Sequence, residues 1–159
     1  MKLKNKYILV ILISGLVIAL DLITKQIFGN TEFKNIIPNI INFETNHGND
    51  GVAFGMFSGN RLVLCIVSCC LVFVLILCDI FFKQNSKLYN IGFSFMLGGA
   101  IGNLIDRLCL GYVRDFINFS FWGNFPTFNI ADSFLTIGVI FICIHLLFLM
   151  PKNDGRKNI

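Results

Sequence analysis

Four long apolar segments constrain this chain more than any other feature of its sequence. They cover residues 7–28, 62–82, 88–110 and 130–150, and each approaches the roughly 20 apolar residues that a helix needs to cross a bilayer core. Of the 159 residues, only 14% are charged, against roughly 25% in an average soluble domain. This composition argues against a soluble domain, a disordered chain and a protein that binds nucleic acid. We expect an all-α membrane protein, with residues 1–159 forming a single integral membrane domain that is a four-transmembrane-helix bundle.

The placement of Lys and Arg predicts the orientation of these segments. Eight of the thirteen lie before residue 7, between the second and third segments, or after residue 150, and only two of the nine acidic residues are on that side, Asp154 and Asp79 near the end of the second segment. Cytoplasmic flanks of membrane helices carry an excess of Lys and Arg, so both termini should be cytoplasmic. The outer loops, at about 29–61 and 111–129, contain a strand-like stretch at 36–43 and a turn-like stretch at 46–51. We therefore expect a small β-containing extracytoplasmic cap.

Two features could suggest a secreted protein, and neither is interpreted in that way. The basic N-terminus followed by an apolar stretch resembles a signal peptide, but the apolar pattern resumes after Asp21, which favours a membrane span. The six cysteines lie within or at the end of apolar runs and include no Cys-x-x-Cys pair, so we expect small hydrophobic side chains and neither a disulfide framework nor a metal site.

Polar residues occur at the outer ends of three of the four segments with the same spacing of i, i+3 and i+4. This spacing places each set on one helical face, and charged groups inside a membrane usually face the bundle interior or a wet cavity. The three faces should therefore meet in one site, although structural ion pairs such as Asp21–Lys25 and Asp106–Arg107, and a helix start at Asn129, would explain each set by itself. The sets are Asp21, Thr24 and Lys25; Asn103, Asp106 and Arg107; and Asn129, Asp132 and Ser133.

Several other polar and small residues have simpler interpretations. Asp79 is interpreted as a charge at the cytoplasmic end of the second segment, His145 as a structural residue and His47 as an exposed loop residue. The glycine-rich run from Gly98 to Gly102 should let the third helix approach a neighbour closely.

Two carboxylates at the outer side are candidates for acid–base chemistry. Asp115 follows the third segment within an apolar stretch, and Asp132 begins the fourth. Two neighbouring carboxylates cannot easily both ionise, so one can deprotonate a water molecule while the other donates a proton, as in aspartic proteases. No His-Glu-x-x-His or Gly-x-Ser-x-Gly motif is present.

The alternative is a small polytopic membrane transporter or channel with a polar site at the outer interface, and a membrane scaffold that only binds partners is a third class. A transport path predicts polar residues throughout the membrane depth, whereas the second and fourth segments are almost uncharged through their middles.

Five motifs, taken together, resemble those of the lipoprotein signal peptidase family, also called signal peptidase II. They follow one another in order over nearly the whole chain, and a second match to Asn-x-Gly, Asn46-His-Gly48, leaves open whether Asn46 or Asn49 is the motif residue. The five are Asp21-Leu-Ile-Thr-Lys25, Asn49-Asp-Gly51-Val-Ala-Phe-Gly55, Gly98-Gly-Ala-Ile-Gly-Asn103-Leu-Ile-Asp106-Arg107, Val113-Arg-Asp115-Phe116 and Phe128-Asn129-Ile-Ala131-Asp132-Ser133.

The resemblance implies an intramembrane aspartic endopeptidase of the cell inner membrane. Its substrate would be a diacylglyceryl prolipoprotein cleaved before the lipidated cysteine, with no metal or organic cofactor and with globomycin-type compounds as inhibitors. Asp115 and Asp132 would be catalytic, at the outer side of the membrane and among its lipids. The residues expected to contact the substrate or to support the aspartates are Asp21, Lys25, Asn49, Gly51, Asn103, Asp106, Arg107, Asn129 and Ala131.

Overall fold

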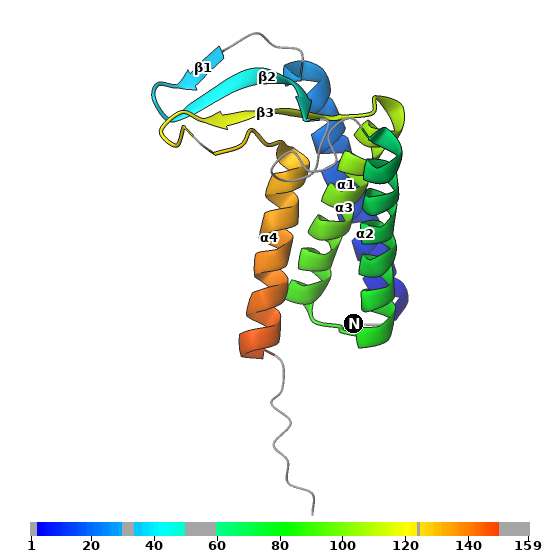
Figure 1. The fold of residues 1–159 in the computed structure, drawn as a ribbon. Coiled ribbons are helices and arrows are strands. Elements are labelled where there is room, and N and C mark those ends of the chain that lie inside the picture. The colour runs from blue at the N-terminus through cyan, green and yellow to red at the C-terminus, as the bar shows by residue number, and fades with distance from the viewer. Residues whose placement is uncertain (1–2, 30–33, 50–59, 124, 150–159) are drawn as a thin grey trace, which may run out of the picture.

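Four long helices and a small sheet make up the computed structural model, which describes residues 3–29, 34–49, 60–123 and 125–149 (Figure 1). The helices are α1 (Leu3–Phe28), α2 (Arg61–Phe82), α3 (Lys87–Cys109) and α4 (Ile130–Ile144), which η2, a π-helical turn (His145–Leu149), extends. The strands are β1 (Lys34–Ile37), β2 (Ile41–Asn49) and β3 (Val113–Phe119). Each helical segment is long and apolar enough to cross a membrane. The expected all-α bundle with a β-containing cap is confirmed, and the first helix begins at Leu3 instead of residue 7.

Helix α3 lies at the centre of the bundle. It packs against α1, α2 and α4, whereas α2 and α4 do not pack against each other over their described residues. More than half of its most apolar window, 56%, is buried, compared with 22% or less in the other three spans. Its mean hydropathy of 1.3 is also the lowest of the four. A helix surrounded by protein can carry glycine and polar residues that a helix facing lipid cannot, so the polar residues of α3 are directed towards its neighbours.

Glycines on α3 let two neighbouring helices approach its backbone, as the sequence predicted. A Cβ atom on Gly98 would lie 2.9 Å from the carbonyl oxygen of Ser14 in α1, and one on Gly99 would lie 2.5 Å from the carbonyl oxygen of Ala131 in α4. A Cβ atom on Gly102 would lie 2.6 Å from a carboxylate oxygen of Asp21. Small residues at these positions therefore hold α1 and α4 against the part of α3 that carries Asn103.

The sheet lies across one end of the bundle, called here the sheet end (Figure 1). It is antiparallel with the order β1-β2-β3, and its ring contacts hold it to α1: Phe28 lies 4.7 Å from Phe43 of β2 and 5.6 Å from Phe116 of β3 between ring centroids. The strand-like stretch expected at 36–43 is divided between β1 and β2 by a turn in which Asn39 has a φ of 59°.

The turn expected at 46–51 is wrong for residues 46–49, which belong to β2, and residues 50–51 lie outside the described residues. Pairing with β3 draws this Asn- and Gly-containing segment into the sheet, with Asn46 opposite Asp115 and Asn49 opposite Val113. The register shifts on both sides of Asn46, so an irregular strand replaces the turn that local sequence alone would favour.

The other end of the bundle, called the loop end, contains the 83–86 connection between α2 and α3. Here Lys6 forms a buried ion pair with Asp79, with 2.7 Å between Nζ and Oδ1, and also donates to the carbonyl oxygen of Gln84. The ring nitrogens of His145 lie 3.0 Å from the Ser86 hydroxyl and 3.2 Å from Gln84 Oε1. Asp79 and His145 thus link helices at the loop end, which agrees with their interpretation as structural residues.

Adding a methyl group at Gly99 should weaken the packing of α3 against α4. The Gly99→Ala variant would place its Cβ against backbone, which cannot move as a flexible side chain can, and we expect a loss of about 1–3 kcal/mol of stability. The measurement is thermal unfolding of the purified protein in detergent. Gly15→Ala is the matched control, because no atom lies within 4 Å of its added Cβ. Equal unfolding temperatures for the two variants would contradict the packing argument.

Candidate active site

A buried ammonium group joins three of the predicted polar residues. Nζ of Lys25 lies 2.7 Å from Oδ2 of Asp21 and 3.3 Å from Oδ2 of Asp106, and it donates a hydrogen bond of 2.9 Å to Oδ1 of Asn103. Lys25, Asp21 and Asp106 are each 1% exposed or less. A charge buried so completely is stable only when it is paired and hydrogen-bonded, and this cluster meets both conditions. The polar faces of α1 and α3 therefore meet as their spacing predicted.

Asp21 extends this cluster to the start of α4. Its Oδ1 accepts a hydrogen bond of 2.9 Å from the main-chain N–H of Ala131, which is one of the N–H groups that the first turn of a helix leaves without an intrahelical partner. Ala131 is fully buried, and its carbonyl oxygen is the atom against which Gly99 packs. Asp21 thus caps a neighbouring helix, and Ala131 takes part through its backbone.

Arg114 is a member of the cluster that sequence reasoning missed. Its guanidinium and main-chain N–H donate three hydrogen bonds to the Asp106 carboxylate, of 2.7, 3.0 and 3.3 Å. These bonds to a carboxylate raise the pKa of Arg114 above its ordinary value. The sequence offered a weak signal, an arginine beside Asp115 in an apolar strand. Asp106 and Arg114 are eight positions apart in the chain and become neighbours only when β3 folds back over α3.

Arg107 does not form the ion pair with Asp106 that the sequence suggested as one alternative. Its side chain is half-buried, and its Nε is buried without a hydrogen-bond partner among the described residues. Its guanidinium is within electrostatic reach of Asp132 and Asp115 as well as of Asp106. Its positive charge therefore acts on both candidate catalytic carboxylates.

Asn129 contacts both candidate catalytic carboxylates. Its side-chain Nδ2 donates a hydrogen bond of 2.6 Å to Oδ1 of Asp115, and its main-chain N–H donates one of 3.2 Å to Oδ2 of Asp132. Its Oδ1 accepts from the main-chain N–H of Asp132, which completes a capping box at the start of α4. Asn129 is therefore the helix start that the sequence suggested, and the same residue contacts both carboxylates.

Asn103 carries the network from Lys25 to Asp132. Its Oδ1 accepts from Lys25 and from Asn129, and its Nδ2 donates a hydrogen bond of 2.7 Å to Oδ1 of Asp132. The ammonium can only donate, so the amide oxygen must face Lys25 and the amide nitrogen must face Asp132. The same reasoning fixes Asn129, because an N–H group of the α4 backbone faces its Oδ1. Each carboxylate therefore receives one amide N–H whose direction is determined by its surroundings.

The fold brings Asp115 and Asp132 together through the segment that precedes α4. Main-chain hydrogen bonds pair Phe128 with β3, in which the N–H groups of Phe116 and Ile117 donate to its carbonyl oxygen. Asp115 is 1% exposed, whereas Asp132 is partly exposed. One buried and one accessible carboxylate thus flank Asn129. Within the described ranges, no three His, Cys, Asp or Glu side chains converge to hold a metal ion.

Four further residues that the sequence singled out either do not join the hydrogen-bond network around Asn103 and Asn129 or lie outside the described residues. The hydroxyls of Thr24 and Ser133 bond to carbonyl oxygens of their own helices. Asn49 ends β2, where its backbone pairs with Val113 beside Asp115. Gly51 lies outside the described residues.

Comparisons with known proteins agree on one family. The family model described as "Signal peptidase (SPase) II" matches residues 13–148. The lipoprotein signal peptidase of Staphylococcus haemolyticus is 39% identical over 150 residues, which cover 91% of this chain and 94% of that protein. That of Lactobacillus johnsonii is 38% identical over 154 residues, or 94% and 99% of the two chains. A solved bacterial membrane enzyme is similar with a TM-score of 0.80 and 37% identity, covering 94% of this chain and 93% of its own. A second has a TM-score of 0.77 and 39% identity, covering 87% and 92%.

Removing the guanidinium of Arg114 should destabilise the site. The Arg114→Gln variant leaves the buried Asp106 carboxylate with Lys25 as its remaining cation, and we expect a loss of about 2–3 kcal/mol of stability. Arg114→Lys should fall between this variant and the parent, because lysine keeps the charge but loses the two-pronged contact. Chemical unfolding in detergent measures the differences. Arg61→Gln is the control, since Arg61 is exposed and has no ion pair with a described residue. A loss for Arg114→Gln no larger than for this control would contradict the assignment.

Proposed function

The chain belongs to the signal peptidase II family, and from this premise we propose that it cleaves lipoprotein signal peptides with Asp115 and Asp132 as its catalytic pair. Its relatives carry the name lipoprotein signal peptidase, and its four apolar helices make it a multi-pass membrane protein. The substrate is a diacylglyceryl prolipoprotein, and the cleaved bond is the one before the lipidated cysteine. These findings give no support to a transporter or channel.

The observation that carries the proposal is the double contact of Asn129. One residue donates a hydrogen bond to Asp115 and another to Asp132, so the two carboxylates lie on either side of it with fixed directions. Their protonation is coupled, because two neighbouring carboxylates resist ionising together and one retains a proton. An ionised and a protonated carboxyl side by side are what hydrolysis of an amide by a water molecule requires.

The surroundings of the two aspartates suggest which of them is ionised. Both oxygens of Asp132 accept N–H donors, it lies in the first turn of α4, where the helix dipole favours an anion, and it is partly exposed to incoming water. Asp115 is buried, which favours the neutral acid. We therefore assign Asp132 as the general base and Asp115 as the general acid.

In the reaction, Asp132 takes a proton from water as the water oxygen attacks the carbonyl carbon before the lipidated cysteine. Asp115 gives its proton to the departing amide nitrogen as the C–N bond breaks. The products are the signal peptide with a new carboxyl terminus and the lipoprotein with a free amino group on its lipidated cysteine. The proton then returns from Asp132 to Asp115, and the pair is ready for another turnover.

Neighbouring residues orient these groups and balance their charge. Asn103 and Asn129 direct one amide N–H at each aspartate, and the Arg107 charge favours the ionised carboxylate and the negative charge that develops on the substrate oxygen. Lys25 holds Asn103 in place. Asn49 and Gly51 are proposed as substrate contacts on the strength of the family motif that they resemble.

The membrane orientation belongs to the same proposal. Eight of the thirteen Lys and Arg lie in the sequence flanks of the four segments before residue 7, at 83–87 and after residue 150, which indicates a cytoplasmic location of both termini in the cell inner membrane. The sheet end and the aspartates then face outward. A cysteine that carries diacylglycerol lies at the membrane surface, where it can reach this site while water arrives from outside. Globomycin-type inhibitors would occupy the same place, in contact with membrane lipid.

Replacing either aspartate by asparagine should abolish cleavage while the protein stays folded. Asp115→Asn and Asp132→Asn each remove one proton-transfer group, and we expect a loss of at least about 100-fold in kcat. The measurement is cleavage of a diacylglyceryl prolipoprotein by the purified protein in detergent, with and without a metal chelator. Asp154→Asn, beyond the fourth helix in the sequence, is the matched control. Full activity of either aspartate variant at an unchanged unfolding temperature would refute the pair.

Reporter fusions should establish the orientation. Green fluorescent protein fused to the C-terminus should fluoresce, and alkaline phosphatase fused at the same position should be inactive, because the first requires a cytoplasmic and the second an external location. Comparable expression of both fusions is the control. An active phosphatase with a dark fluorescent protein would reverse the proposed topology without affecting the assignment of the aspartates.

A further inference from the structure

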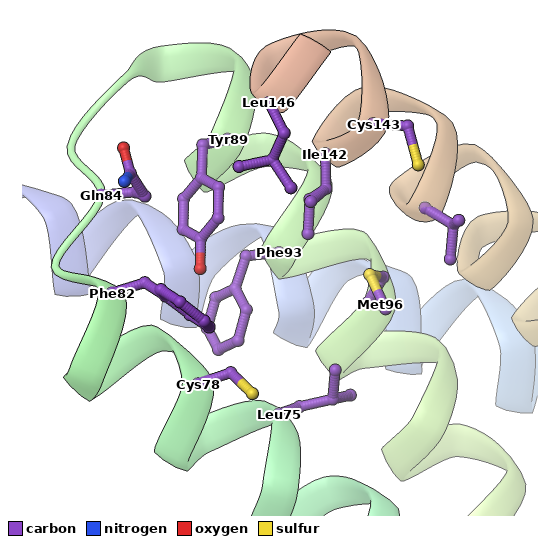
Figure 2. Close-up of a pocket in the computed structure, with 11 residues that line it drawn as sticks. Leu75, Cys78, Phe82, Gln84, Tyr89, Phe93, Met96, Ile142, Cys143 and Leu146 are labelled. Carbon is purple, nitrogen blue, oxygen red and sulfur yellow. The ribbon is translucent and has the colours of Figure 1, made fainter. Parts of the chain in front are cut away.

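A cavity of about 400 Å³ lies between α2, α3 and α4 near the loop end (Figure 2). Its walls are almost entirely apolar, with Leu75, Phe82, Tyr89, Phe93, Met96 and Leu146 prominent among them. None of its lining residues belongs to the candidate active site. It exists because α2 and α4 both pack on α3 and not on each other, and the Tyr89 and Phe93 rings fill the interval between them only in part.

The cavity opens to the outside of the bundle at the depth of the membrane. Phe82 is 65% exposed, and Val139 and Leu146 are each 45% exposed. Leu75 and Phe82 mark its extent along α2, and their seven-residue separation corresponds to roughly 10 Å along the helix axis. An apolar cavity of this kind excludes water and favours an apolar guest.

Two lysines lie close in the chain to Gln84, one of the residues that line the cavity. Gln84 is preceded by Lys83 and followed three residues later by Lys87. Both lysines are exposed, and neither forms an ion pair with a described residue. Lys6 at the same end is already paired with Asp79. Two unpaired lysines beside an apolar cavity complement a ligand with an apolar tail and an anionic head.

We propose that this cavity binds one acyl chain of an anionic phospholipid, whose phosphate lies against Lys83 and Lys87. An acyl chain supplies the apolar tail that the cavity walls favour, and the phosphate of the same lipid supplies the anionic head that the two lysines complement. The binding does not depend on the proposed peptidase activity, and only the identity of the leaflet, the cytoplasmic one, rests on the proposed orientation.

The test is native mass spectrometry of the full-length protein released from detergent, with either dioleoylphosphatidylglycerol or dioleoylphosphatidylcholine added. The two lipids share their chains and differ in head-group charge. We expect phosphatidylglycerol to bind at least five-fold more tightly. Lys83→Gln and Lys87→Gln should each lower this preference by about five-fold, as expected for one lysine near a charged head group, and Lys4→Gln, exposed at the same end, should leave it unchanged.

Filling the cavity tests the position of the acyl chain. Cys78→Phe should weaken binding of both lipids at least ten-fold, because Cys78 lines the cavity, whereas Cys69→Phe on the exposed side of the same helix should not. Cys143→Phe provides a second filling variant if Cys78→Phe does not fold. Equal affinity for the two lipids in the parent protein, or equal binding by the Cys78 and Cys69 variants, would overturn the proposal. Two other results would also overturn it, each with lipid affinity unchanged. Slower prolipoprotein cleavage after cavity filling would identify a signal helix as the occupant, and dissociation of a dimer would identify a second copy of the chain.

Discussion

The ion cluster around Lys25 is the interaction on which the rest of the structure depends. An ammonium group inside a bilayer has no water to solvate it, so the bundle must supply its partners. Asp21 and Asp106 supply two negative charges, and Arg114 restores neutrality from the sheet. The three segments that carry these residues are thereby fixed at one depth. Glycine at position 102 is needed for the same reason, because a side chain there would meet the Asp21 carboxylate.

The cluster also determines the geometry of the proposed catalysis. Lys25 orients Asn103, Asn103 donates to Asp132, and Asn129 joins Asp132 to Asp115. Each link uses a donor and an acceptor whose directions cannot be exchanged, so the aspartates are held before any substrate arrives. The sheet contributes through Arg114 and the Phe28–Phe43–Phe116 contacts, which hold β3 above α3. Charge that is costly in a membrane is in this way concentrated at the place where the chemistry needs it.

Periodicity and hydropathy predicted the parts of the fold that a bilayer dictates. The four helices, the shared depth of their polar faces and the close approach at the glycines follow from local spacing. Long-range pairing does not follow from local spacing. Arg114 bonds to Asp106 only after the chain changes direction between α3 and β3, and Asn46 lies in a strand because β3 pairs with it. Arg107 is a second example: local spacing suggested an ion pair with Asp106, but that carboxylate pairs with Lys25 and Arg114 instead. The cavity between α2, α3 and α4 could not be read from the sequence, because it depends on how α2 and α4 each pack on α3.

In the proposed mechanism Asp115 and Asp132 share one proton, and the pH dependence of kcat/KM for prolipoprotein cleavage reports on that proton. At low pH both carboxyls are protonated and the base is lost; at high pH both are ionised and the acid is lost. A shared proton therefore gives a bell-shaped profile across the range of pH in which the protein stays folded. A profile that only rises with pH to a plateau would show that no acid is required, and it would contradict the paired mechanism.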